Sequence, residues 1–186
     1  GMLFASTRTL QAALIAISTP LVCAQSLLVE VGAQRGIQAY TRAPGLSAGI
    51  AAEDFDGDGD IDLFVPNGVG AVDQVYVNDG LGQFTESAAS LGLNHSGNHR
   101  AGLWFDADGD GDLDLATVGD CYEDVVCTGE PSVRLHRQRP DGRFEEVTFR
   151  AGLGRDLKIQ PDTHVGGIAA GDIDNDGDLD LFVVFW

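Results

Sequence analysis

Along the chain, a short apolar run is followed three times by an acidic stretch and then at once by a second apolar run. The runs before the acidic stretches read SAGIAAE, RAGLWF and VGGIAAG, and those after them begin LFV, LAT and LFVVFW. Each run has the length of a strand rather than a helix, and glycine and aspartate cluster at its ends. Helical periodicity is weak throughout, so we predict a strand, an acidic loop and a second strand at each place.

A second element recurs between the acidic stretches. The segment VYVNDGLGQFTESAASLGL at 75–93 aligns without a gap with LHRQRPDGRFEEVTFRAGL at 135–153, with a glycine and a phenylalanine in register. The tail of this element occurs once more as LVEVGAQRGI at 28–37. The repeating unit is therefore predicted to be a strand, an acidic loop, a strand, a variable loop, a strand, a glycine turn and a strand.

The acidic stretches share the pattern D-x-D-x-D-G-D-[IL]-D. They read DFDGDGDID at 54–62, DADGDGDLD at 106–114 and DIDNDGDLD at 172–180. Aspartates at positions 1, 3 and 5 converge on one point only if the backbone curls around it, and the glycine at position 6 permits that sharp turn. A hard cation such as Ca²⁺ takes about six to eight oxygen ligands, which makes it the expected occupant, whereas Mg²⁺ prefers fewer protein ligands in stricter geometry.

An EF-hand loop would supply a bidentate glutamate at position 12, where this chain has Val65, Thr117 and Val183. Instead, the aspartate at position 9 can close the cage, while the aspartate at position 7 points outward and offers its carbonyl oxygen. A solvated acidic turn is the alternative, and three copies with the glycine in one place count against it. The predicted residues of about three Ca²⁺ sites are Asp54, Asp56, Asp58, Asp60, Asp62, Asp106, Asp108, Asp110, Asp112, Asp114, Asp172, Asp174, Asp176, Asp178 and Asp180.

Charge narrows the range of partners. The chain has 186 residues, enough for one domain or slightly more, and its hydrophobic content of 44% argues against disorder despite a formal net charge of -18. Nucleic acid and anionic membranes are poor partners for so acidic a protein, and cations are good ones. One local basic cluster is predicted to be a solvated strand edge, with a site for an anionic partner as the alternative: Arg134, Arg137, Arg139 and Arg143.

The first residues have the pattern of a signal peptide. Arg8 supplies a positive charge before the mainly apolar stretch 10–24, and small side chains precede a plausible cleavage site before Gln25. Polar residues and a proline interrupt the stretch, so a transmembrane span is disfavoured. We predict a signal peptide over 1–24 and a mature chain over 25–186 that is secreted, periplasmic or on the cell surface, without a membrane span.

Export sets the redox environment of the two cysteines that remain after cleavage. Cys121 and Cys127 lie close together in GDCYEDVVCTGE, and we predict that they form a small disulfide. Two unpaired thiols are the alternative. A zinc site is not expected there, because zinc would need four such ligands.

These motifs resemble the FG-GAP/VCBS repeats of integrin-alpha-like β-propellers. The resemblance rests on the acidic loops, on Y-x-N-x-G-x-G-x-F at 76–84 and on AGL at 151–153, it covers 28–186, and it is greatest to the secreted cartilage acidic protein/UnbV-like subgroup. It implies an all-β fold of four-stranded antiparallel blades, with Ca²⁺ held between the first two strands of each blade. The second copy of the tyrosine segment departs from the pattern at His136, Gln138 and Pro140.

A propeller closes with about four to eight blades. This chain has two full repeats and the start of a third, so we expect a partial propeller of about two and a half blades, truncated at its C-terminus relative to the family. A ring assembled from several copies is the alternative.

The resemblance implies a non-catalytic adhesion or interaction module with structural calcium, which would bind a protein or a glycan. The alternative is the N-terminal part of a calcium-containing propeller enzyme such as a polysaccharide lyase. The sequence contains no nucleophile elbow and no catalytic zinc motif. We expect structural or surface roles rather than catalysis for the four histidines, which are His95, His99, His136 and His164.

Overall fold

The structure, a computed structural model, describes residues 30–38, 49–68, 71–120, 132–153 and 164–185. The predicted signal peptide at 1–24 lies outside these residues, and so do Cys121 and Cys127 with their predicted disulfide. Both therefore remain predictions. Among the described residues, no helix has the length and apolar character needed to span a membrane.

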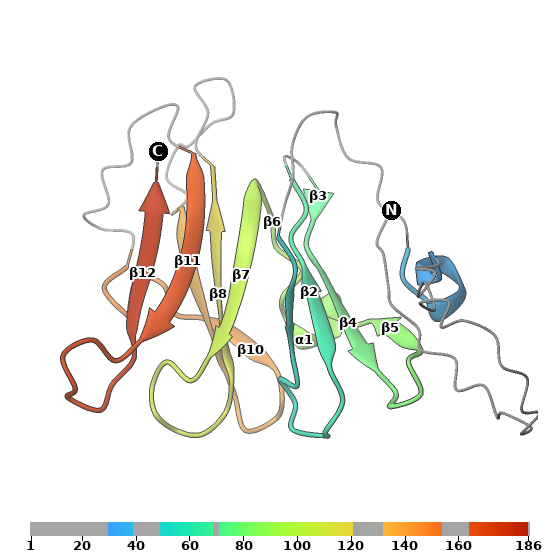
Figure 1. The fold of residues 1–186 in the computed structure, drawn as a ribbon, viewed down its shortest axis with the longest axis horizontal. Coiled ribbons are helices and arrows are strands. Elements are labelled where there is room, and N and C mark those ends of the chain that lie inside the picture. Colours follow the sequence, from blue (N-terminus) through green and yellow to red (C-terminus); the bar gives the residue numbers. More distant parts are fainter. Residues whose placement is uncertain (1–29, 39–48, 69–70, 121–131, 154–163, 186) are drawn as a thin grey trace, which may run out of the picture.

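The described chain is built from antiparallel sheets (Figure 1). The first sheet has the order β1-β2-β4-β5 and the second has the order β10-β9-β8-β7, followed by a hairpin of β11 and β12. The strands of the first sheet are Ala51–Glu53, Asp62–Val65, Gln74–Asn78 and Phe84–Glu86 for β1, β2, β4 and β5. Those of the second sheet are His99–Phe105, Asp114–Gly119, Val133–Gln138 and Phe144–Glu146 for β7 to β10, and the hairpin strands are Val165–Gly171 and Asp180–Phe185.

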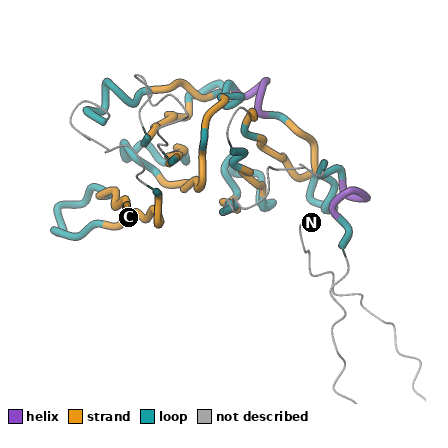
Figure 2. Tube along the Cα trace, turned by 90° about the horizontal axis from the view of Figure 1, so that it is seen from above, coloured by secondary structure: helices purple, strands orange, loops and turns teal. Residues whose placement is uncertain are grey.

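In the described part of the chain, helix is confined to two short elements, drawn purple in Figure 2: η1 at Gly32–Arg35 and α1 at Ala88–Leu91. A small ladder of β3 (Ala71–Val72) and β6 (Ser96–Gly97) completes the described elements. The predicted all-β fold of four-stranded antiparallel units, present as a partial propeller of two sheets and a further hairpin, is confirmed.

Both faces of each sheet are apolar. On β2, Phe64 lies in the core between the first and second sheets, while Leu63 lies on the opposite face beneath Ile37 of the N-terminal segment. On β8, Leu115 lies in the core shared with the first sheet, and Ala116 lies in the core shared with the hairpin. Because neighbouring residues of a strand point to opposite faces, these continuous apolar runs require cover on both sides.

Aromatic rings fill the core between the first and second sheets. Phe55 is stacked on Trp104 with a centroid separation of 4.8 Å and an interplanar angle of 11°. Phe64 meets the same indole edge to face at 6.4 Å. Gly102 on β7 makes room for this contact, since a Cβ there would lie 2.4 Å from the Phe64 ring. The two sheets therefore pack closely only with glycine at this position.

One turn is repeated at the end of each unit and explains the recurring sequence tail. The amide N–H groups of Ile37, Leu93 and Leu153 each donate to the carbonyl oxygen five residues earlier, at 2.9, 2.8 and 3.0 Å. The glycine before each of them has a φ of 87°, 83° and 80°, respectively. This is the Schellman arrangement of a helix end. Leu93 and Leu153 each enter the core that follows their own sheet.

The two later turns provide a matched test of this packing. Gly92 and Gly152 both have left-handed backbones, but a Cβ at Gly92 would lie 2.9 Å from the carbonyl oxygen of Phe144, whereas one at Gly152 would meet no described residue. We expect Gly152→Ala to lower the free energy of unfolding by about 1 kcal/mol and Gly92→Ala by about 2 kcal/mol or more. Urea denaturation of both variants would measure the difference, and equal losses would contradict the described packing.

Candidate metal centres

The three acidic loops occupy equivalent places in the fold. Each connects the first two strands of its unit, joining β1 to β2, β7 to β8 and β11 to β12. All three lie along the same edge, the lower edge in Figure 1. The repeated sequence therefore produces a row of acidic loops on one side of the protein.

A repeated hydrogen bond shapes each loop. The amide N–H of the position-6 glycine donates to the carboxylate of the position-1 aspartate across the loop. This bond joins Gly59 to Asp54 at 2.9 Å, Gly111 to Asp106 at 3.0 Å and Gly177 to Asp172 at 3.1 Å. The three glycines have φ values of 96°, 94° and 99°. The predicted turn at position 6 is confirmed, because this backbone region favours glycine.

Position 4 is also left-handed in all three loops, which the sequence reasoning missed. Gly57 and Gly109 have φ values of 74° and 73°, and Asn175 has a φ of 60°. Asn175 has the only positive φ of a non-glycine residue in the described part of the chain. The signal was present in the sequence, since asparagine is one of the few residues other than glycine that tolerate this region.

The folded loops bring carboxylates together in three groups. In each group, one oxygen of every member lies within 4.8 Å of the others, and the groups are Asp54, Asp56 and Asp58; Asp106, Asp108 and Asp114; and Asp172, Asp174 and Asp180. The first loop thus gathers positions 1, 3 and 5, whereas the other two gather positions 1, 3 and 9. Such clusters are common on protein surfaces without an ion, so the ligand role of these side chains remains a prediction.

The position-7 aspartates lie outside these groups. Asp112 and Asp178 are exposed, while Asp60 is half-buried against Gly80, where a Cβ would lie 2.4 Å from its carboxylate. The amide N–H of each position-7 residue donates to the carboxylate of position 5 at 3.0 to 3.1 Å. The position-7 residues thus join these hydrogen bonds through their backbone N–H groups and not through their carboxylates.

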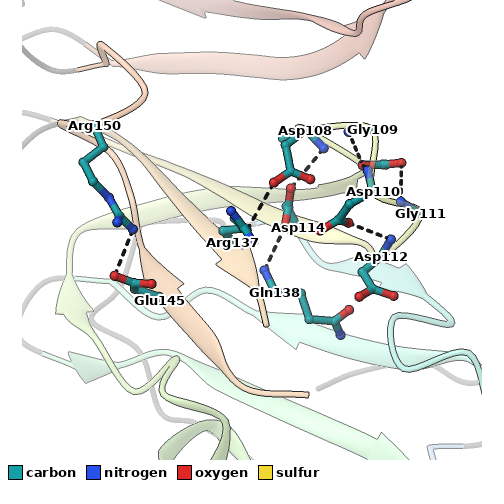
Figure 3. A network of polar contacts seen from close by, with 12 residues as sticks. Asp108, Gly109, Asp110, Gly111, Asp112, Asp114, Arg137, Gln138, Glu145 and Arg150 are labelled. Atoms are coloured by element: carbon teal, nitrogen blue, oxygen red, sulfur yellow. Dashed lines mark hydrogen bonds and ion pairs between the residues drawn. The ribbon is translucent and has the colours of Figure 1, made fainter. Parts of the chain in front are cut away.

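The position-9 aspartates tie each loop to its sheet. Asp62 accepts a hydrogen bond from the amide N–H of Asn78 at 2.8 Å, and Asp114 accepts one from Gln138 at 2.7 Å and one from Ala107 at 3.0 Å (Figure 3). Both carboxylates are buried. In the third unit Asp180 accepts a bond from Ile173 at 3.1 Å. Position 9 therefore joins the loop to the third strand in both complete sheets, and it also closes the loop on itself in the second and third units.

In the first loop, burial and neighbouring carboxylates disfavour the charged form of Asp62. Burial raises the pKa of Asp62 to about 6; the Asn78 N–H opposes this shift, and the carboxylates of Asp56, Asp58 and Asp54 add to it. The Oδ2 atom of Asp62 and the Oδ1 atom of Asp54 are buried without a hydrogen-bond partner among the described residues. Buried oxygens of this kind are costly, and a cation would satisfy them.

In the second loop, arginine provides part of the balancing charge. The Nε atom of Arg137 lies 3.1 Å from Oδ2 of Asp108 (Figure 3). Arg137, Arg139 and Arg143 are exposed, as predicted for a solvated strand edge. The prediction is wrong for Arg134, which is buried on the opposite face of β9 and paired with Glu146 at 3.0 Å. The alternation of β9 separates Arg134 from Arg137.

Comparison with known families identifies the repeat. The sequence pattern of the FG-GAP-like repeat matches residues 54–117 and 118–183, which together make up more than half of the chain. No curated protein has significant sequence similarity to this chain.

The structural role of the position-9 aspartate can be tested in the absence of any metal. Two backbone N–H groups donate to the Asp114 carboxylate. In Asp114→Asn, the amide NH₂ group would face one of these donors, and that hydrogen bond would be lost. We expect Asp114→Asn to lower the free energy of unfolding by about 1–3 kcal/mol in EDTA, and Asp112→Asn, on an exposed side chain of the same loop, by about 0.5 kcal/mol or less. Denaturation with urea would distinguish them, and similar values for both would contradict the described role of Asp114.

Proposed function

Because this chain belongs to the FG-GAP-like repeat family, we propose that it is an exported, calcium-binding interaction module without catalytic activity. The observation that carries this proposal is the set of three loops with the same backbone turn and gathered carboxylates on one edge of the fold. FG-GAP repeats are in general non-enzymatic interaction modules built as β-propeller-like sheets. The matched segments include all three loops.

The residues of the loops fit a hard cation. All donors are carboxylate or carbonyl oxygens, which Ca²⁺ prefers. The two buried oxygens without partners, on Asp54 and Asp62, are what a cation would satisfy in the first loop. The side chains at positions 1, 3, 5 and 9 and the carbonyl at position 7 would hold the ion. Bound calcium would supply positive charge that offsets the clustered aspartates and fixes the loops.

Calcium would act on folding rather than on chemistry. Ligands that bind the folded state alone stabilise it in proportion to the logarithm of their concentration, and this site forms only when the chain curls. In the second loop the ion would compete with the Arg137 guanidinium for Asp108. Calcium binding would release this side chain and change the charge displayed along β9.

The proposed partner is a protein or a glycan outside the cytoplasm. The signal-peptide pattern at 1–24 and the cysteine pair at 121 and 127 support export, and the strong negative charge disfavours nucleic acid. The rigid stack of sheets would present its connecting loops to the partner, as is usual where binding residues lie on loops held by a scaffold.

Metal specificity tests this proposal. Thermal and urea unfolding would be compared in Ca²⁺, in Mg²⁺ and in EDTA. We expect Ca²⁺ at about 100 times its dissociation constant to stabilise the fold by about 2.7 kcal/mol for each site, and Mg²⁺ to stabilise it much less.

Two variants provide the matched control. Asp108→Asn should weaken the calcium effect by removing one carboxylate of the second loop, whereas Asp141→Asn, on an exposed turn residue of the same sheet, should leave it unchanged. Equal stabilisation of the protein by calcium and magnesium, or equal calcium response of the two variants, would refute calcium binding in these loops.

A further inference from the structure

A second group of possible metal ligands lies outside the acidic loops, where the second sheet faces the first. His136 on β9 and Glu146 on β10 are directly paired across the ladder. His95, in the connection between α1 and β6, places its ring against His136 with a centroid separation of 4.7 Å and an interplanar angle of 31°. One ligand atom of each of the three residues lies within 4.8 Å of the others.

Three of the four imidazole nitrogens of this group are buried without a hydrogen-bond partner among the described residues. His136 is 1% exposed, and both of its ring nitrogens are buried without a hydrogen bond to any described residue. Nε2 of His95 is likewise buried without a hydrogen bond to any described residue. A protein rarely buries polar atoms in this way unless water or an ion satisfies them. One nitrogen of each histidine is gathered beside one carboxylate, and this grouping of buried ligand atoms points to an ion.

The protonation states suit metal binding. Burial, with a smaller contribution from the neighbouring His95, lowers the pKa of His136 to about 3, so its imidazole is neutral near pH 7. Burial alone would raise the pKa of Glu146, but the guanidinium of Arg134 and the hydroxyl of Thr148 lower it overall. His136 therefore offers an imidazole lone pair, and Glu146 a carboxylate anion, near pH 7.

Two neighbours hold the carboxylate in place. Arg134 donates from Nη1 to Oε2 of Glu146 at 3.0 Å, and the Thr148 hydroxyl donates to Oε1 at 3.0 Å. Carboxylates that bind metals are commonly fixed by such outer hydrogen bonds, and each oxygen keeps a second lone pair. The positive charge of Arg134 weakens the electrostatic pull on a cation, so binding here must depend largely on the imidazoles. This favours a metal that prefers nitrogen ligands over Ca²⁺.

We propose that His95, His136 and Glu146 bind a divalent transition-metal ion, with Zn²⁺ the best match, at the interface of the first and second sheets. Two imidazoles and one carboxylate form a known ligand set for zinc, in which water takes the fourth position. Ligands of tetrahedral zinc lie about 3.3 Å apart, given metal–ligand distances of about 2.0–2.1 Å. The group must therefore contract, and His95 can approach because it lies in a connection rather than in a strand.

The ion would act as a clamp between the two sheets. His95 belongs to the connection that follows the first sheet, whereas His136 and Glu146 belong to the second. This inference does not depend on calcium binding, because it uses different residues and a different class of ligand.

The test is titration of the intact chain with Zn²⁺ and with Co²⁺ in excess Ca²⁺, so that calcium competes for the acidic loops. We expect one Zn²⁺ per chain by calorimetry, a rise in melting temperature, and visible Co²⁺ absorption typical of a site with nitrogen ligands. His95→Ala and Glu146→Gln should each weaken zinc affinity at least about 100-fold, since removal even of outer-shell partners costs about 10–100-fold.

Two control variants test whether Zn²⁺ binds at this site rather than at other histidines or carboxylates of the chain. His164→Ala removes a histidine from another part of the fold, and Asp108→Asn alters an acidic loop, so both variants should keep the zinc affinity of the parent protein. His95 is only half-buried, so its variant is expected to fold, which far-ultraviolet circular dichroism would verify. Failure of the parent chain to bind Zn²⁺, or unchanged affinity in folded His95→Ala and Glu146→Gln variants, would overturn the proposal.

Discussion

The stacking of sheets with two apolar faces is the constraint on which the rest of the structure depends. Leu63 and Phe64 on β2, and Leu115 and Ala116 on β8, are neighbours in the chain whose side chains enter different cores. A sheet of this kind cannot leave either face in water without losing the burial that stabilises it. Successive units must therefore stack face to face, and the stacking repeats the geometry of one unit in the next.

This repetition places the acidic loops. Because each unit has the same strand order, the connection between its first two strands emerges on the same edge each time. Within each loop, the position-1 carboxylate closes the turn onto the position-6 glycine. In the two complete units, the position-9 carboxylate also holds the loop against the third strand of the sheet. The aspartates thus shape the backbone before any ion is considered. The same arrangement concentrates negative charge that a cation is well suited to offset.

The interface between the first two sheets combines two kinds of packing. Phe55, Phe64 and Trp104 fill one part with closely packed rings. Another part holds polar side chains, among them His136 and Arg134, whose burial must be balanced by partners. Arg134 has Glu146 as a partner, whereas the imidazole nitrogens of His136 have none among the described residues. An ion that prefers nitrogen ligands would balance these imidazoles, as proposed above.

The sequence by itself determined the strands, the repeat and the turns of the acidic loops, because these depend on local periodicity and on backbone freedom at residues such as Gly59 and Gly111. Only the tertiary structure decided which residues meet across sheets. It buried Arg134, set Gly102 beneath Phe64, and brought His95 to His136. These contacts join residues far apart in the chain, and they depend on strand register and on sheet stacking, which no local pattern specifies.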